Sequence, residues 1–320
     1  MGLGLRGPAC RAVHVEARAK LNLGLAVGPR RPDGFHEIAT VFQSISLGDT
    51  LVITPRPRGF SLAVRFEDAA IARRVSPAPN IERRAMPRGR ENLVLRAARV
   101  LRAHGLEGGA RFELVKRIPS RAGLGGGSAD AAAALIGLAR LYGVRVPPRG
   151  RVQWAAGLGA DVPFQTTGGT ALGVGRGDRL LALRLERPLR ALVAVPSWRV
   201  STATAYGRLD RGKYALTGWR AKLRFAQSLR SDAIRPRDAL RLGNSFEVAL
   251  GDQRRAFDSL CERLRRAGLE NPRMSGSGSA VFGVLQPGAS ARALVERFEG
   301  TETLYAVRSA RRALRVLVDG

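Results

Sequence analysis

The stretch IPSRAGLGGGSADAAAAL, residues 118–135, joins a glycine-rich loop to an alanine-rich run. Four of the five residues 123–127 are glycine, and only Leu124 interrupts them. Glycine accepts positive φ angles and lets backbone N–H groups approach a ligand closely. The alanine run predicts a helix over residues 128–142, which begins with unpaired N–H groups and the positive end of the helix dipole. Loop and helix together predict a cradle for an anion, best suited to a phosphate.

A tight structural turn is the alternative explanation of these glycines, but four of them before Ser128 exceed what a turn requires. Two common phosphate motifs are excluded. The Walker pattern G-x-x-x-x-G-K-[ST] is absent. A G-x-G-x-x-G pattern started at Gly123 places Ser128 where the last glycine of a Rossmann fingerprint should stand. The loop is therefore a phosphate site of another kind.

Length and composition indicate a globular α+β protein. The chain has 320 residues, of which 45% are apolar and 25% charged, so the prior favours two domains. A composition shift at a second glycine cluster places the expected boundary between residues 1–168 and 169–320. The apolar runs are too short to span a bilayer, and no secretory signal is evident. Cys10 and Cys261 form no disulfide framework or metal spacing, which favours a reducing cytoplasm.

The net charge of +28 is the unusual property of the composition. It is compatible with an anionic partner such as nucleic acid, but the arginines are spread along the chain without a tail or stripe. We therefore expect a solvated basic surface and no nucleic-acid or membrane partner. Only four of the 54 basic residues are lysine, namely Lys20, Lys116, Lys213 and Lys222. Lysine is a compact point charge, unlike the planar guanidinium, so each lysine is a candidate for a specific task.

Periodicity and turn residues predict the order of the elements. Strands followed by helices in each half favour two α+β layers over a doubly wound parallel sheet. A turn is predicted at 29–35, a loop at 67–90, and a short helix followed by a loop at 151–164. Strands are predicted at 14–27, 36–47, 49–55, 110–119, 168–183 (as a hairpin), 190–198, directly after the SGSG of residues 275–278 and at the carboxyl end. Further helices are predicted at 91–105, 201–209, 219–230, 243–250, 252–267 and 288–298.

Three motifs together resemble the GHMP kinase superfamily. The pattern Pro119-x-x-x-Gly123-Leu124-Gly125-Gly126-Gly127-Ser128-Ala129 is similar to its phosphate loop, P-x-x-x-G-L-G-[SG]-[SG]-x-A. AKLN at 19–22 resembles its first motif, and SGSG at 275–278 resembles its third. The resemblance implies an N-terminal ribosomal-protein-like domain that binds ATP and a C-terminal ferredoxin-like α/β sandwich.

Within the superfamily, the motifs are similar to those of the kinase family that phosphorylates a cytidine diphosphate ester of methylerythritol in the non-mevalonate isoprenoid pathway. AKLNLGL, RPDGFHEIATVFQSISLGD, AGLGGGSADAA, GADVPF, STATAY and MSGSGSAVFG occur in that family's order, from about residue 16 to about residue 311. The D-G-F-H element combined with GADVPF makes the resemblance specific. Two positions depart from the usual pattern: Phe35 replaces a frequent tyrosine, and Ser245 in GNSFE replaces a common aspartate.

The resemblance implies roles for particular residues. Asp161 would accept the proton of the attacked hydroxyl, and the Lys20 ammonium would stabilise charge beside it. Phosphoryl transfer needs positioning and charge stabilisation more than covalent help. The cytosine ring would be held by Phe35, His36 and Tyr206, with Asn22 and Thr202 also toward the substrate. The ATP side comprises Pro119, Ser120, Arg121, Ala122, Gly123, Leu124, Gly125, Gly126, Gly127, Ser128 and Ala129, with Asn92 and Lys116 as further candidates.

Mg²⁺ would arrive with ATP, and Ser128 is the protein oxygen expected near it. The expected partner is the small-molecule substrate, with the protein acting as a monomer or homodimer. Two alternatives remain open: another small-molecule kinase of the superfamily, acting on homoserine or a mevalonate derivative, and a basic RNA-binding protein on the same fold. DGFH argues against the first. The second has no use for Lys20, Asp161 and the glycine loop together.

Overall fold

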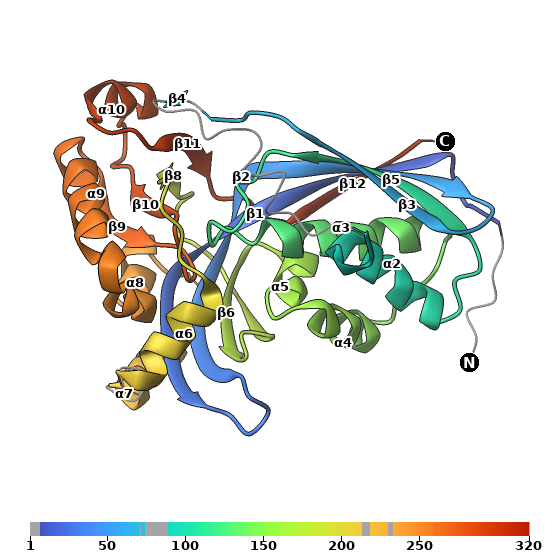
Figure 1. The fold of residues 1–320 in the computed structure, drawn as a ribbon, viewed down its shortest axis with the longest axis horizontal. Coiled ribbons are helices and arrows are strands. Elements are labelled where there is room, and N and C mark those ends of the chain that lie inside the picture. Colours follow the sequence, from blue (N-terminus) through green and yellow to red (C-terminus); the bar gives the residue numbers. More distant parts are fainter. Residues whose placement is uncertain (1–6, 71, 74–88, 213–217, 230–232, 320) are drawn as a thin grey trace.

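The strands form two sheets that differ in size and in their place along the chain. The computed structural model describes residues 7–70, 72–73, 89–212, 218–229 and 233–319. Within these ranges one sheet has seven strands and the other has five. Helices accompany both sheets, so the expected α+β class is confirmed (Figure 1).

Two long antiparallel strands, β1 (Ala12–Arg30) and β2 (His36–Arg56), run through the seven-stranded sheet. The carboxyl half of β2 pairs with β5, and its amino half pairs with β6, so that the order is β12-β1-β2-β5-β3 with β6 and β7 beside β2. The two strands expected at 36–47 and 49–55 are therefore one continuous strand. The remaining strands are β3 (Phe60–Phe66), β5 (Gly109–Lys116), β6 (Thr170–Gly175), β7 (Arg179–Leu183) and β12 (Leu314–Asp319).

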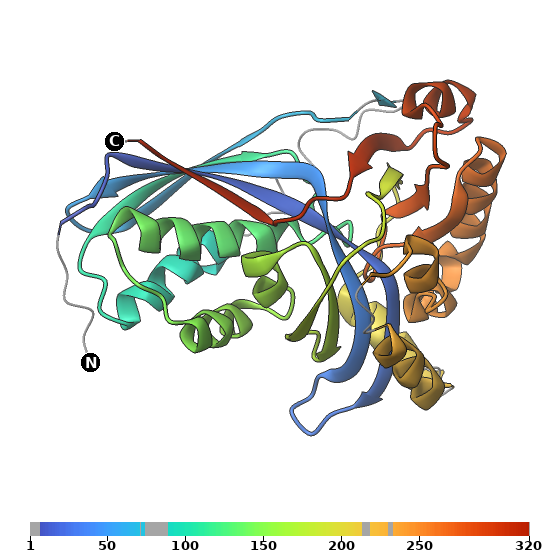
Figure 2. The ribbon, with the colours of Figure 1, turned by 180° about the vertical axis from the view of Figure 1, so that it is seen from behind.

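Figures 1 and 2 show a layer of helices on one face of this sheet. They are α2 (Leu93–Ala103), α3 (Gly126–Leu141), α4 (Pro148–Leu158) and α5 (Val162–Thr167). The alanine run explains the place of α3, since small side chains let a helix lie close to a sheet: residues 131–134 are fully buried. At Gly137 the helix lies so close to the sheet that even a Cβ would not fit, since it would lie 2.6 Å from Ile53 Cδ1. Close packing of α3 fixes the loop that precedes it.

The five-stranded sheet has the order β4-β11-β8-β10-β9 and lies between α9 and the first sheet (Figure 1). The hydrophobic core beside this sheet includes buried side chains of α9, such as Leu260 and Leu264. The strands are β4 (Ala72–Arg73), β8 (Arg190–Val195), β9 (Glu270–Met274), β10 (Val281–Val284) and β11 (Thr303–Arg308). The accompanying helices are α6 (Thr202–Arg211), α7 (Trp219–Ser228), α8 (Pro236–Leu240), α9 (Arg254–Arg266) and α10 (Ala291–Arg297), with 3-10 turns η1 (Gly89–Glu91), η2 (Ser245–Ala249) and η3 (Gly251–Gln253).

Three local predictions were wrong. The loop expected at the end of 151–164 contains the short helix α5, which tolerates Pro163 because its first turn needs no N–H from that residue. The helix expected at 243–250 is the 3-10 turn η2, capped by the Asn244 side chain, and α8 precedes it. The carboxyl end holds two strands, β11 and β12. In the predicted loop at 67–90, β4 and η1 lie within the described residues, and 74–88 lie outside them.

The expected boundary at 168/169 stays a prediction, but the topology bears on what such a boundary would divide. β6, β7 and β12 all come after it in the chain, yet all are hydrogen-bonded into the seven-stranded sheet. β12 runs antiparallel to the beginning of β1, pairing Ala12 with Asp319. Among the helices that the structure describes, none has the length and apolar character to cross a membrane.

Candidate active site

A cavity of about 1060 Å³ opens where the β1–β2 hairpin, the glycine loop, the start of α5, α6 and the 276–278 loop meet. The sequence motifs thus converge on one place although they are far apart in the chain. Of the predicted site residues, the cavity is lined by Lys20, Asn22, Phe35, His36, Arg121, Gly123, Gly125, Ser128, Asp161, Thr202 and Tyr206.

Lys20 and Asp161 form an ion pair at this cavity. Lys20 lies on β1, and its side chain is 4% exposed, whereas that of Asp161, at the residue before α5, is 33% exposed. The distance from Lys20 Nζ to Asp161 Oδ2 is 3.3 Å. The Asp161 side chain makes no capping bond to α5. A carboxylate that faces the cavity and a buried ammonium beside it can handle a proton and a developing negative charge.

Asn22 connects Lys20 to the third motif. Residues two apart on a strand share a face, and Lys20 Nζ donates to Asn22 Oδ1 at 2.5 Å. Asn22 Nδ2 donates to Thr40 Oγ1 at 2.8 Å on the adjacent strand. The Asn22 backbone N–H donates to Ser275 Oγ at 3.3 Å, and that hydroxyl donates to Gly123 O at 3.0 Å. Asn22 therefore holds the lysine in place. Asn22 is itself held by Thr40 on the adjacent strand and by Ser275 of SGSG, which also bonds the glycine loop.

The glycine loop has the backbone that its sequence predicts. Gly123 and Gly125 have φ angles of 78° and 71°, whereas Gly126 and Gly127 are the first residues of α3. A Cβ on Gly123 would lie 2.0 Å from Ser275 O, and one on Gly125 would lie 2.9 Å from Lys20 Cγ. Gly125 provides no side-chain cap to the helix, so among the described residues the first N–H groups of α3 lie beside the cavity without a capping side chain. This is the geometry of a helix N-terminus that can bind a phosphate.

Other predicted ATP-side residues are set back from the cavity lining. Ala122 and Leu124 are buried and anchor the loop; Ala280 N donates to Ala122 O at 3.0 Å, and Lys20 N donates to Leu124 O at 2.9 Å. Asn92 caps α2, accepting from Val94 N at 2.9 Å. Pro119, Ser120, Gly126, Gly127 and Ala129 complete the loop and the first turn of α3.

Lys116 lies behind the glycine loop, buried between two carboxylates. Its Nζ donates to Asp130 Oδ2 at 2.7 Å and also to Asp49. Burial opposes the charge of this ammonium, but the two carboxylates outweigh it and raise its pKa. Asp49 Oδ1 accepts in addition from the backbone N–H groups of Arg117 and Ile118, at 2.6 and 2.8 Å. The Lys116 cluster, defined as Lys116, Asp49 and Asp130, thus joins β2, the end of β5 and α3.

The aromatic side chains lie at the other end of the cavity. The Phe35 ring, at the tip of the β1–β2 hairpin, is half exposed. His36 is buried and stacks on Tyr206 with a centroid distance of 4.8 Å, while His36 Nε2 and Asp210 Oδ1 are 2.7 Å apart. Phe246 meets the Tyr206 ring edge-on at 4.9 Å. Burial, followed by the charge of Asp161, raises the pKa of the Tyr206 phenol, which is therefore neutral and a hydrogen-bond donor.

Two hydroxyls join motifs across the cavity rim. Thr202 Oγ1, at the start of α6, lies 2.9 Å from Ser277 Oγ in SGSG. Ser245, which stands where aspartate is common in the similar family, accepts from the Val27 backbone N–H at 3.1 Å. Its neighbour Asn244 donates from Nδ2 to Met274 O at 2.7 Å and to Gly276 O at 2.9 Å. GNSFE therefore fixes the SGSG loop against β1.

The lining residues that sequence reasoning had not singled out include Arg176 and Asp210, whereas 276–278 belong to the SGSG motif that it had identified. Asp210 lies one helical turn after Tyr206, a spacing that could have shown that it shares the face of α6. Arg176 is one arginine among many, and its place between Gly175 and Gly177 was the only available signal.

The residues present fit a nucleoside triphosphate and its divalent cation. The uncapped start of α3 suits phosphate oxygens, and the cavity lining near it includes the Ser128 hydroxyl and the Asp161 carboxylate. Mg²⁺ bound with a nucleotide takes most of its ligands from phosphates and water and one or two from the protein.

These features define a small-molecule kinase of the GHMP type. The family model for the N-terminal domain of GHMP kinases matches residues 92–169, and that for the C-terminal domain matches residues 225–301. A solved homoserine kinase from Cytophaga hutchinsonii, 19% identical with a TM-score of 0.66, shares the fold over 97% of this chain and 98% of its own.

Relatives with higher sequence identity show which family of GHMP kinases the chain belongs to. The chain is 40% identical over 292 residues to 4-diphosphocytidyl-2-C-methyl-D-erythritol kinase of Pelotomaculum thermopropionicum, covering 89% of this chain and 93% of that protein. A solved 4-(cytidine 5'-diphospho)-2C-methyl-D-erythritol kinase matches with a TM-score of 0.67 and 35% identity over 93% of this chain and 99% of its own. The chain belongs to the 4-diphosphocytidyl-2-C-methyl-D-erythritol kinase family. It is an ATP-dependent small-molecule kinase.

Proposed function

We propose that the protein transfers the γ-phosphoryl group of ATP to the 2-hydroxyl of 4-diphosphocytidyl-2-C-methyl-D-erythritol. The observation that carries this proposal is the Lys20–Asp161 pair, 3.3 Å apart, in one cavity with a phosphate-type loop and exposed aromatic surface. The ends of the cavity differ in chemistry: one end has free helix N–H groups, and the other has rings and a histidine.

At the reacting centre, the oxygen of the substrate's tertiary hydroxyl attacks the γ-phosphorus of ATP. Asp161 accepts the proton of that hydroxyl during the attack. The bond from phosphorus to the ADP oxygen breaks, and ADP leaves with that electron pair. The Lys20 ammonium stabilises the charge that spreads over the transferring group. Asn22 holds Nζ of Lys20 by the 2.5 Å hydrogen bond, so the lysine needs little reorganisation during the reaction.

At the substrate end, Phe35 and Tyr206 provide the stacking surfaces for a cytosine ring. Both line the cavity, and base–aromatic stacking is worth about 1–3 kcal/mol per base. His36 supports Tyr206 by stacking at 4.8 Å and is oriented by Asp210. We retain the prediction that His36 reads the pyrimidine edge, and that Thr202 lies toward the substrate.

At the nucleotide end, residues 119–129 would surround the ATP phosphates, with Asn92 and Lys116 as further candidates on the same side. Mg²⁺ would be bound through the phosphates and Ser128, and it would neutralise phosphate charge during transfer. We also propose that the protein acts in the cytoplasm as a monomer or homodimer, and that its charge of +28 serves no nucleic-acid partner.

The test is an ADP-release assay with Mg·ATP on three acceptors: the cytidylated substrate, methylerythritol phosphate and homoserine. We expect turnover of the first, with kcat/KM lower by orders of magnitude for the second because the stacking and edge contacts are lost. Equal activity on the first two would contradict the cytidine assignment and leave only a GHMP small-molecule kinase. Activity confined to homoserine would replace the proposed substrate.

A further inference from the structure

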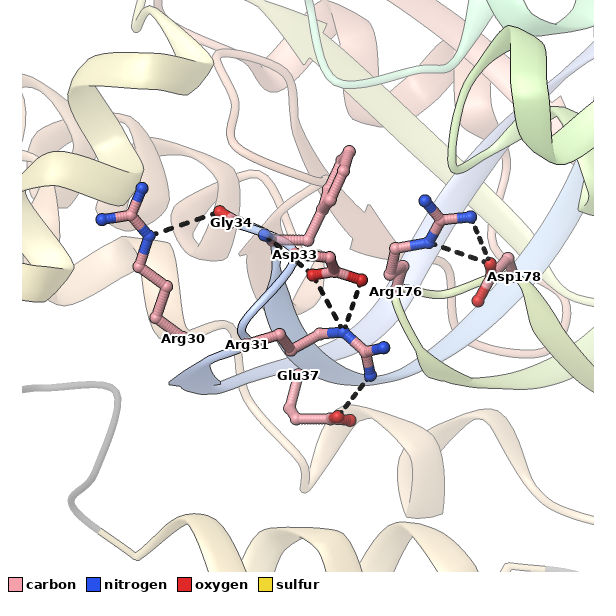
Figure 3. A network of polar contacts seen from close by, with 8 residues as sticks. Arg30, Arg31, Asp33, Gly34, Glu37, Arg176 and Asp178 are labelled. Carbon is pink, nitrogen blue, oxygen red and sulfur yellow. Dashed lines mark hydrogen bonds and ion pairs between the residues drawn. The ribbon is translucent and has the colours of Figure 1, made fainter.

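Arg176 occupies a defined position at the cavity rim that none of the proposed roles explains. It stands in the turn between β6 and β7, flanked by Gly175 and Gly177 with φ angles of 73° and 93°. β6 pairs directly with β2, with Ile38 opposite Gly175. This register brings the turn beside the tip of the β1–β2 hairpin, and Figure 3 shows Arg176 next to Asp33, with its guanidinium turned toward Asp178.

The guanidinium of Arg176 is held on one side and faces an aromatic ring on the other. Its Nε and Nη2 donate to Asp178 Oδ2 at 3.1 and 2.9 Å, which fixes the plane of the group (Figure 3). Its Cζ lies over the Phe35 ring, 5.0 Å from the centroid. A cation at this distance from a ring face is attracted by the ring quadrupole.

The hairpin tip carrying Phe35 is braced from within. Asp33 Oδ1 accepts from the Phe35 backbone N–H at 3.2 Å and from Arg31 Nε at 3.2 Å. Arg31 Nη1 donates to Glu37 Oε1 at 2.5 Å, and Arg30 Nε donates to Gly34 O at 3.4 Å (Figure 3). These bonds fix the backbone of Phe35. Within the part of the chain that the structure describes, its half-exposed side chain is restrained by the contact with Arg176.

We propose that Arg176 is a specificity-determining positioning residue: it covers one face of the Phe35 ring and keeps the opposite face presented to a pyrimidine. The inference rests on the proposed function, because it assumes that Phe35 stacks on the substrate base. Asp178 serves Arg176 by fixing the guanidinium plane. A ring held in advance binds a base without first losing side-chain freedom, which is how preorganisation raises affinity.

The experiment is calorimetric binding of two probes, cytidine and cytidine 5′-diphosphate, to wild type, Arg176→Met and Arg176→Lys. We expect Arg176→Met to weaken both probes equally, by about threefold to tenfold, as loss of a cation–π contact at a partly exposed site implies. Arg176→Lys should restore part of the affinity. In turnover, KM for the cytidylated substrate should rise while kcat and the KM for ATP stay near wild type.

A double-mutant cycle with Phe35→Ala gives the decisive readout, because Arg176→Met should have no further effect once the ring is gone. The matched control is Arg179→Met, which removes the same charge from an exposed position in β7 and should leave both affinities unchanged. An undiminished effect of Arg176→Met in the Phe35→Ala background would overturn the inference. So would a loss confined to the diphosphate, which would mean direct phosphate contact.

The same titrations separate this inference from the proposed function. Binding of both probes to wild type, abolished by Phe35→Ala but unchanged by Arg176→Met, would refute the role of Arg176 and leave the proposed function intact. Failure of wild type to bind either probe would refute the cytidine site itself, and the inference with it.

Discussion

Lys20 and Lys116 are both buried lysines in a chain that otherwise uses arginine, yet their surroundings differ. Lys20 has one carboxylate partner, at 3.3 Å, and that partner is a third exposed to the cavity. Lys116 has two carboxylate partners whose side chains are 0% and 3% exposed. The first ammonium can still act on a ligand that enters the cavity. The second is already fully engaged by the fold.

The difference teaches how one residue type serves two purposes. A buried cation with excess carboxylate around it holds elements together and is costly to remove. A buried cation with a single, partly exposed carboxylate partner is preorganised to stabilise negative charge that develops on a bound substrate. This contrast supports the proposed catalytic role of Lys20, and it favours a structural role for Lys116 behind the glycine loop over its predicted nucleotide-side role. Lys222 is partly exposed on α7, and Lys213 lies outside the described residues.

The largest expected effect is at the Lys20 site. Asp161→Asn keeps the size of the side chain but removes its ability to take a proton, so kcat should fall by roughly 10²–10⁴-fold. The free energy of unfolding should change little, since the Asp161 side chain makes no capping bond to α5. Steady-state kinetics and urea unfolding on the same preparation check both parts. Near-normal turnover in the folded variant would show that the base lies elsewhere.

At the Lys116 cluster we expect the large effect on stability, and not on kcat as at Asp161. Lys116→Met leaves two buried carboxylates without their cation and should lower the free energy of unfolding by about 3–5 kcal/mol. Urea unfolding measures this loss. Lys116→Met with Asp49→Asn and Asp130→Asn serves as the control, because neutral groups should recover part of the stability. A stable Lys116→Met variant that had lost only ATP affinity would instead support the predicted nucleotide-side role.

The glycine loop, placed between the two lysines, should show an intermediate effect. Gly125→Ala introduces a Cβ at a φ of 71°, 2.9 Å from Lys20 Cγ, so it should displace both loop and lysine. Small misplacements of reacting groups cost up to about 100-fold in rate. We expect a reduction of kcat/KM for ATP of this order. Gly157→Ala in α4 is the control, since a Cβ there meets nothing within 4 Å; equal effects of the two would remove the loop from the site.

The smallest effect is expected for ion pairs on the surface. Arg254 Nε and Asp258 Oδ2 in α9 are 2.7 Å apart, as close as the buried pair between Lys116 and Asp130, but both side chains are about half exposed. Asp258→Ala should change the free energy of unfolding by less than about 1 kcal/mol, because solvent screens the pair. Thermal unfolding at low and high salt checks this. A loss as large as that of Lys116→Met would mean that burial does not explain the difference.

The sequence predicted the parts of the site that local chemistry determines. Four glycines before an alanine run require a loop and a helix start, and AKLN on a strand places Lys20 and Asn22 on one face. The sequence could not predict contacts made by packing. Asp49 lies 67 residues from Lys116 and meets it only because β2 pairs with β5. The pairing of His36 with Asp210 likewise depends on where α6 docks, 174 residues later.

The misjudged elements have different causes. α5 has six residues, too few for a helical period to show, and Pro163 favoured a loop. β12 returns to pair with β1 across almost the whole chain, which no local pattern indicates. The aromatic residues illustrate a further limit: the family resemblance implied that Phe35 and Tyr206 hold the substrate ring, which stays a prediction, but the stacking of His36 on Tyr206 emerges only from the fold.

The most direct test of the distinction between the two lysines is a single-turnover measurement on Lys20→Met. The variant, saturated with Mg·ATP and mixed with the cytidylated substrate, would be quenched over time to follow transfer of the labelled γ-phosphoryl group. We predict that the rate of the chemical step falls by at least about 100-fold, while ATP affinity and the free energy of unfolding stay near wild type. A normal single-turnover rate, or a variant whose loss of activity follows loss of folding as in Lys116→Met, would contradict the account.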